Sequence, residues 1–158
     1  MLTILKMYDH LNWANKRILT SLESFDNAQH KAIDNAEHKA IQLFAHILQS
    51  EQVWFTRLQG KDTTSMELWP DADLHICAQL VIYNQSDFRA YLTQRTNADL
   101  DGLISYKNQA GSTYQTSIRG ILTHVALHGQ YHRGQINSLL RLEEGMEPIN
   151  VDFITFVR

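Results

Sequence analysis

The sequence of 158 residues predicts an all-α protein, a four-helix bundle that forms a single domain over residues 1–158. Four long segments carry apolar residues three and four positions apart, the spacing that places side chains on one face of a helix. Helix breakers are scarce, because the chain has two prolines and no glycine precedes Gly60. One stretch before the fourth segment lacks helical periodicity and predicts a long connection there.

The first three helices are predicted from their apolar faces. The first extends over about Leu2–Leu22, and its face consists of Ile4, Tyr8, Leu11, Ile18 and Leu22. The second extends over about Glu37–Gln59, and Gly60 follows as a residue that can end it. A loop with Pro70 leads to the third, over about Asp71–Arg95. The predicted buried face of this helix consists of Ile76, Leu80, Tyr83 and Ala90.

The connection to the fourth helix has a different pattern. Strand-forming residues between Leu103 and Thr116 flank the polar stretch Asn108–Gly111 and predict a short β-hairpin or an extended connection. Ser117 is a candidate cap for the fourth helix, which is predicted to end near Gly145. Its apolar face consists of Ile118, Ile121, Leu122, Val125, Ile136, Leu139 and Leu140. The apolar C-terminal tail, residues 151–157, is expected to pack back onto the domain.

Composition argues against several functional classes. Lys and Arg total 14 and Asp and Glu total 17, a net charge of −3, so the chain lacks the basic surplus of nucleic-acid binders. The single cysteine, Cys77, excludes an internal disulfide and is expected to fill the core. No apolar run approaches the roughly 18 residues that cross a bilayer. We expect a cytoplasmic protein with no membrane or nucleic-acid partner.

Histidines form the most informative pattern. His124, His128 and His132 stand four residues apart and form a column along the predicted fourth helix. His128 and His132 lie within its apolar face, and His124 lies at the edge. Buried imidazoles need polar partners, which hydrogen bonds or a metal ion could supply. A histidine pair at this spacing holds zinc in zinc proteases, but no glutamate stands between the two here, which excludes that enzyme class.

A further ligand would have to come from another helix. His46 is the best candidate because it lies in the middle of the apolar second helix, although a surface histidine fits its position too. The remaining histidines are expected to be exposed; they are His10, His30, His38 and His75.

Other polar residues interrupt the apolar faces, namely Tyr8, Asn15, Glu51 and Asp87. Each could line a pocket or orient a ligating histidine. For the two carboxylates we expect burial and pairing with an arginine or tyrosine. Arg133 is expected to pair with a glutamate rather than bind an anionic substrate. The tryptophans are expected in packing or interfaces; they are Trp13, Trp54 and Trp69.

Two strings of residues resemble the DinB family of damage-inducible proteins, which is distinct from the lesion-bypass polymerase of the same name. One runs from Leu43 through His46 to Trp54, and the other is the string from His124 to Ile136 with its H-x-x-x-H-R-G-Q pattern. Segments near both ends of the chain are similar as well, around Trp13-Ala14-Asn15 and Val151-Asp152-Phe153. The resemblance therefore extends over nearly the whole chain.

The resemblance implies a four-helix bundle with a divalent metal ion, zinc or nickel in most relatives, held by His46, His128 and His132. Water would take an open position, and His124 is not among the usual ligands. Many relatives form homodimers, and the wider superfamily includes thiol S-transferases and isomerases that use low-molecular-weight thiols.

Two functions compete at this point. The first is a metal-dependent enzyme, either a thiol S-transferase or a hydrolase, in which Tyr8 and Glu51 are the candidate bases. The second is a non-catalytic stress-response protein in which the ion joins two helices and His124 closes the fourth position. A bundle without metal, in which the histidines form core hydrogen bonds, is the third alternative.

Overall fold

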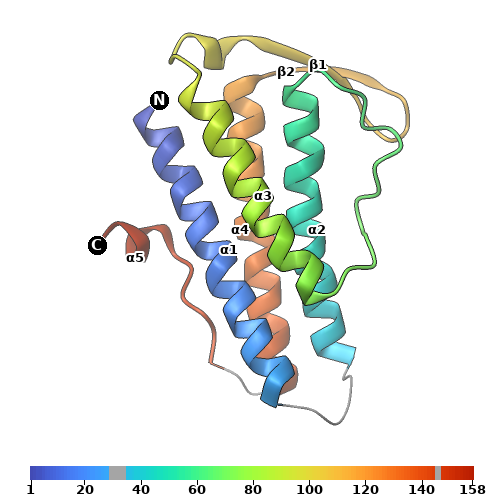
Figure 1. The fold of residues 1–158 in the computed structure, drawn as a ribbon, viewed down its shortest axis with the longest axis vertical. Helices are drawn as coiled ribbons and strands as arrows, with labels where there is room; N and C mark the ends of the chain where they lie inside the picture. The colour runs from blue at the N-terminus through green and yellow to red at the C-terminus, as the bar shows by residue number, and fades with distance from the viewer. Residues whose placement is uncertain (29–34, 145–146) are drawn as a thin grey trace.

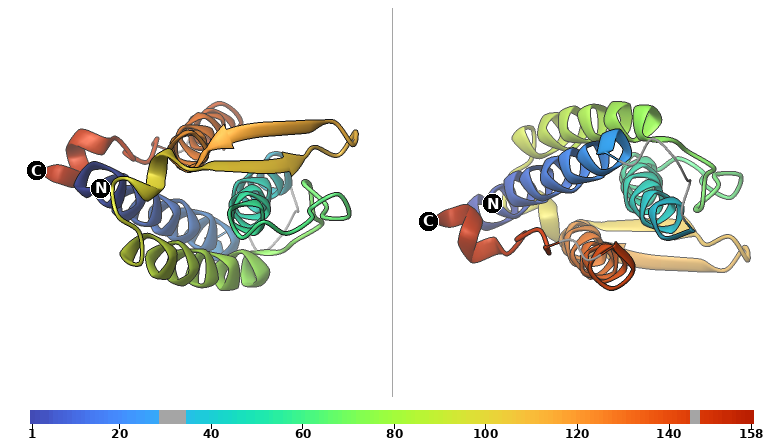
Figure 2. Two further views of the ribbon diagram at one scale, coloured as in Figure 1. Left: turned by 90° about the horizontal axis from the view of Figure 1, so that it is seen from above. Right: turned by 90° about the horizontal axis from the view of Figure 1, so that it is seen from below.

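The computed structural model describes residues 1–28, 35–144 and 147–158. Four long helices lie lengthwise against one another (Figure 1), and they are α1 (Leu2–Ala28), α2 (Asn35–Leu58), α3 (Leu74–Thr93) and α4 (Ile118–Glu144). Helix α1 packs against α3 and α4, and α2 packs against the same two helices. Figure 2 shows these helices end-on, and buried apolar side chains form two clusters among them. The prediction of an all-α bundle is confirmed. No helix in the described ranges is long and apolar enough to cross a membrane.

The order of the helices requires one long crossover. Helices α2 and α3 run in the same direction in Figure 1, so residues 59–73 return along the side of the bundle before α3 begins. Gly60, with φ of +72°, ends α2 as predicted, since glycine adopts positive φ without the steric penalty of a side chain. The crossover passes beside α2 and supplies residues to the site described below.

Helix α1 is longer than predicted. Its apolar pattern stops at Leu22, but the helix continues to Ala28. Neither glycine nor proline interrupts this stretch, and extending an existing helix adds one hydrogen bond for each residue fixed. The end of the apolar pattern at Leu22 therefore does not coincide with the end of the helix.

The predicted buried face of α3 is wrong. Ile76 and Tyr83 are 42% and 60% exposed, Ala90 is exposed and Leu80 is half-buried. The buried residues are Cys77, Val81, Asn84, Phe88, Tyr91 and Leu92. Apolar side chains occur on both sides of α3, and Asn84 lies at the centre of the buried side. Because this polar residue interrupts the apolar pattern there, the prediction from apolar spacing chose the side that is exposed. Burial of Cys77 was predicted correctly.

The predicted β-hairpin is present before α4. Strand β1 (Leu103–Lys107) pairs antiparallel with β2 (Thr113–Ser117), after the short 3-10 helix η1 (Asp99–Asp101). The hairpin lies across one end of the bundle (Figure 1). The Ser117 Oγ accepts a hydrogen bond of 3.1 Å from the Gly120 amide, which is the predicted N-terminal cap of α4. Gly145, where α4 was expected to end, is outside the described residues.

The C-terminal tail packs on the domain as predicted, as the short helix α5 (Phe153–Val157) against α1. His10 lies between the two elements. Its Nε2 is 2.8 Å from the Val151 carbonyl, and its ring contacts Phe153 and Phe156. The expectation that His10 is exposed is wrong, because it is 7% exposed under this tail.

A buried polar network connects the four long helices. Arg133 of α4 donates from Nη1 to Asn15 Oδ1 of α1 over 2.7 Å. Asn15 donates to one carboxylate oxygen of Glu51 on α2 (2.9 Å), and Asn84 of α3 donates to the other (2.7 Å). All of these residues are at most 2% exposed. Unpaired polar groups are costly in a core, so these hydrogen bonds constrain the rotation and depth of each helix.

Arg133 requires a glycine one turn before it. A Cβ atom at Gly129 would lie 2.9 Å from Arg133 Nη1. The guanidinium is fully buried and donates to both Asn15 and Gln130, so it cannot move aside freely. Gly129 therefore provides the space that the buried guanidinium occupies.

We expect Gly129→Ala to lower the free energy of unfolding by about 1 to 2 kcal/mol, because overpacking outweighs the better helix propensity of alanine. Gly134→Ala is the matched control in the same helix, since a Cβ atom there meets nothing within 4 Å. It should stabilise the protein by about 0.5 to 1 kcal/mol. Urea denaturation of both variants measures the difference, and equal effects would contradict this role for Gly129.

Candidate metal centre

The structure brings together the three histidines that the sequence suggested as ligands. His46 lies on α2, and His128 and His132 lie one turn apart on α4. One ring nitrogen from each residue lies within 4.8 Å of the others. The ring centroids of His46 are 5.1 Å from His128 and 4.9 Å from His132. His46 is buried, whereas the other two are half-buried, so the cluster lies at the side of the bundle rather than at its centre.

The crossover segment fixes the orientation of His46. The Leu68 carbonyl lies 2.7 Å from His46 Nδ1, and because a carbonyl only accepts, Nδ1 carries the proton and donates. The Trp69 ring stacks on the imidazole with centroids 3.8 Å apart and planes 6° apart. With Nδ1 occupied, the lone pair of Nε2 is available to a metal ion.

A glutamine on the same helix orients His132. Nδ1 of His132 lies 2.6 Å from Gln135 Oε1, an acceptor, so this nitrogen also donates. The amide nitrogen of Gln135 in turn donates to the Tyr131 hydroxyl over 3.3 Å. The Nε2 atoms of His132 and His128 lie 3.1 Å apart. Two histidines therefore have hydrogen-bonded Nδ1 atoms, as is usual for histidines that bind metals.

The environment favours the neutral form of His46 and His128. Burial lowers the pKa of His128 to about 4, and repulsion from His132, His46 and His124 contributes. Burial also lowers the pKa of His46, with a smaller opposing effect from the Leu68 hydrogen bond. Neutral imidazole is the form that binds metals, so these two residues need not lose a proton to do so at neutral pH.

The donor set fits a divalent transition metal. Imidazole suits zinc and nickel, and a tetrahedral ion with bonds of 2.0–2.1 Å separates its ligand nitrogens by about 3.3 Å. The 3.1 Å between the His128 and His132 nitrogens is close to that value. Within the described ranges no other His, Cys, Asp or Glu joins the group. Three protein ligands with an open position are typical of catalytic rather than structural sites.

His124 does not join the cluster although it belongs to the same column. It is exposed, and its ring contacts Trp54 and His128 with centroids 5.0 Å and 5.5 Å away. It therefore does not close the fourth position in this structure.

The candidate bases do not reach the cluster. The Tyr8 hydroxyl donates to the Leu122 carbonyl over 3.2 Å, and burial raises its pKa well above the usual value. Glu51 binds Asn15 and Asn84, not an arginine or tyrosine as expected, and Asp87 is half-buried rather than buried. Tyr8 and Glu51 belong to the bundle interior and not to the metal centre.

Other sequence expectations have mixed outcomes. His38 and His75 are exposed as expected, and His30 is outside the described residues. Arg133 has direct hydrogen bonds to Asn15 and Gln130, so its link to a glutamate runs through an asparagine. Trp69, expected in packing or an interface, covers a candidate ligand.

Sequence reasoning missed the residues that orient the ligands. The role of Gln135 could have been predicted, because it follows His132 by three residues and so lies on the same side of the helix. The role of the Leu68 carbonyl could not have been predicted, since the position of a backbone atom in an irregular segment does not depend on a recognisable pattern of residue types.

Comparison with known proteins supports the resemblance to a family noted in the sequence. A model of the DinB family matches residues 1–158. Among curated proteins, the chain is similar to the protein named DinB of Bacillus subtilis (strain 168), with 23% identity over 145 residues. The alignment covers 86% of this chain and 83% of that protein. The similarity thus extends well beyond the histidine strings.

The buried carboxyl of Glu51 predicts an unusual pH dependence of stability. Burial raises its pKa from 4.5 to about 7, although hydrogen bonds from Asn15 and Asn84 and the charge of Arg133 oppose the shift. Because the folded pKa exceeds the unfolded one, this residue stabilises the fold most below pH 4.5. That contribution is lost as pH rises through 7.

We therefore expect the unfolding free energy of the wild-type protein, relative to Glu51→Gln, to fall by up to about 3 kcal/mol between pH 4.5 and 7.5. Taking the difference removes the contributions of the other titratable groups, because both proteins contain them. Urea denaturation at several pH values measures it. A difference that is constant with pH would show that burial does not raise the pKa of Glu51.

Proposed function

The chain belongs to the DinB family, and we propose that His46, His128 and His132 bind one divalent metal ion, zinc or nickel, in the active site of an enzyme. One observation carries the proposal. Three imidazoles converge, two of them with Nδ1 already hydrogen-bonded, and no fourth ligand closes the site within the described part of the chain.

The proposed reaction is transfer of a low-molecular-weight thiol to an electrophilic carbon of the substrate. The S–H bond of the thiol breaks, a sulfur–carbon bond forms as the bond to the leaving group breaks, and the leaving group takes up the thiol proton. A divalent ion bound by three neutral ligands keeps its full charge and lowers the pKa of a thiol or a water in the open position. A thiol starts from a pKa of about 8.5 and water from about 15.7, so a thiol needs far less help to ionise. No described carboxylate joins the cluster as a base, which favours thiol transfer over hydrolysis.

The protein residues around the cluster have defined parts in this proposal. The Leu68 carbonyl and Gln135 hold the Nδ1 protons of His46 and His132 and so keep both Nε2 atoms available. The indole of Trp69 covers one face of His46 and limits the access of water from that side. A purely structural metal would need a fourth protein ligand, and His124 instead contacts Trp54.

Cobalt substitution tests the open position. We expect the visible spectrum of the Co²⁺-loaded protein to change on addition of 2-mercaptoethanol, with a new sulfur-to-cobalt charge-transfer band, because the thiol enters the coordination sphere. Ethanol at the same concentration is the control and should leave the spectrum nearly unchanged. A spectrum that is indifferent to thiols would indicate a closed, structural site and would contradict the proposed reaction.

A further inference from the structure

A cleft of about 320 Å³ lies between α2 and α4, beside the candidate metal centre. Leu43 lines it from α2, and Gln135, Ser138 and Leu139 line it from α4. The two leucines are half-buried, so each keeps part of its apolar surface uncovered. Sites for small molecules have volumes of about 300–1,000 Å³, so the cleft has room for part of a small ligand.

The cleft begins one helical turn from the metal ligands. Helix α2 runs toward the hairpin and α4 runs away from it (Figure 1), so residues before His46 and residues after His132 lie on the same side of the cluster. Leu43 precedes His46 by three residues and Gln135 follows His132 by three, about 4.5 Å along each helix. Gln135 Oε1 lies 2.6 Å from His132 Nδ1. The same glutamine therefore lines the cleft and orients a candidate ligand.

The cleft offers apolar surface rather than charge. None of its lining residues is ionisable. Both polar ends of the Gln135 amide are already hydrogen-bonded, to His132 and to the Tyr131 hydroxyl, which leaves the exposed Ser138 hydroxyl as the other polar group of the lining. A ligand would therefore gain affinity here by burying hydrocarbon against the two leucines.

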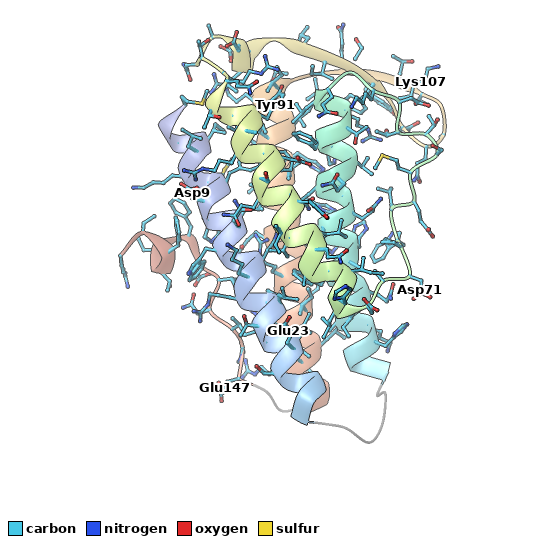
Figure 3. All side chains as sticks on the ribbon, viewed as in Figure 1. Asp9, Glu23, Asp71, Tyr91, Lys107 and Glu147 are labelled. Atoms are coloured by element: carbon cyan, nitrogen blue, oxygen red, sulfur yellow. The ribbon has the colours of Figure 1, made fainter. Side chains whose placement is uncertain are left out.

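The positive charge near the hairpin lies far from this cleft. Figure 3 shows Lys107 at the hairpin end of the bundle and Asp71 well below it. The Asp71 carboxylate accepts a hydrogen bond of 3.4 Å from Gln42, the residue before Leu43. Leu43 itself lies about 22 Å along α2 from Leu58, where the helix ends. Charge around the cleft therefore does not attract an anionic group.

Exposed aromatic rings continue the apolar surface around the cluster. Trp69 is 52% exposed although it stacks on His46, and its ring also contacts that of His132 with centroids 6.4 Å apart. Tyr131 is 64% exposed, and its ring centroid is 5.0 Å from that of His132. Large apolar side chains exposed next to a few convergent polar groups are typical of a small-molecule site.

We propose that the electrophilic substrate of the metal centre carries an uncharged hydrocarbon group and that this group binds in the cleft between Leu43 and Leu139. The inference rests on the proposed function, because it takes the metal centre as the place of reaction. The thiol is held by its bond to the metal, whereas the electrophile must be brought within about 3.5 Å of the sulfur by contacts of its own. Burial of its hydrocarbon group in the adjacent cleft supplies such contacts.

The first test uses the metal-free protein and thioethers that the proposed reaction would form from 2-mercaptoethanol. These probes are 2-(methylthio)ethanol, 2-(butylthio)ethanol and 2-(hexylthio)ethanol, titrated while leucine methyl resonances are followed by NMR. We expect affinity to rise with chain length, about two- to fourfold for each methylene that the cleft covers, and the methyl groups of Leu43 and Leu139 to shift. Affinity that is independent of chain length, or shifts at other leucines alone, would overturn the proposal.

Variants in α4 locate the binding group. Leu139→Asn should remove most of the gain in affinity between the methyl and butyl probes, because it replaces one apolar wall of the cleft. Leu142→Asn is the matched control and should keep the gain, since Leu142 is on the same helix, is 80% exposed and does not line the cleft. Ser138→Glu changes an exposed position and should also reduce the gain, whether or not Leu139→Asn folds. A gain that either folded cleft variant leaves unchanged would overturn the proposal.

Sedimentation velocity tests the alternative occupant of the cleft, a second copy of the chain. We expect the wild-type protein and Leu139→Asn to have the same oligomeric state, with and without the butyl probe. Dissociation of a wild-type oligomer by Leu139→Asn would show that the cleft is an interface between copies and would overturn the proposal.

A second test joins the cleft to the metal centre. On zinc-loaded protein, 2-mercaptoethanol loses its proton and displaces bromide from an alkyl bromide to form a thioether. We expect KM for 1-bromobutane to be about fourfold or more below KM for bromoethane, and Leu139→Asn to remove that difference. If the thioether forms but the two bromides have equal KM values, the cleft does not serve the metal centre and the inference fails. If zinc does not bind or no thioether forms, the proposed function fails, while the metal-free titration still shows whether the cleft binds hydrocarbon.

Discussion

The bundle depends on one buried polar network, in which Arg133, Asn15, Glu51 and Asn84 each come from a different helix. Apolar packing tolerates small rotations of a helix, but a buried hydrogen bond is lost when its donor turns away. The network therefore sets the rotation of α2 and α4 about their axes. Because Arg133 directly follows His132, holding the arginine inside the core places the histidine at the side of the bundle, where it meets α2.

The two sets of polar residues have opposite electrostatic character. In the core, the carboxyl of Glu51 and the guanidinium of Arg133 are linked through Asn15. Burial raises the pKa of Glu51 to about 7 and lowers the pKa of Arg133 to about 10. At the side of the bundle, burial and mutual repulsion keep His46 and His128 neutral without any carboxylate among their described neighbours. Neutral ligands leave the charge of a bound ion uncompensated, which is what activation of a thiol requires.

Much of this arrangement could be predicted from the sequence. Helical spacing predicted the bundle, and four-residue spacing placed His128 and His132 together, because both depend on local geometry. The position of His46 in the apolar second helix made it the best candidate for a further ligand, and the resemblance to a family implied the same residue. The crossover that brings Leu68 and Trp69 to His46 was not predicted, since an irregular segment carries no periodic signal. The buried face of α3 was assigned wrongly because Asn84, at its centre, is polar.

The central claim is that three particular histidines form the metal centre, and zinc affinity measured by competition with a chromophoric chelator tests it most directly. The wild-type protein should bind one equivalent of zinc, and His128→Ala should bind it at least a hundredfold more weakly. His124→Ala, one turn away on the same helix, should retain the wild-type affinity because its ring lies outside the cluster. A protein that binds no zinc, or an equal loss in both variants, would contradict this account of the site.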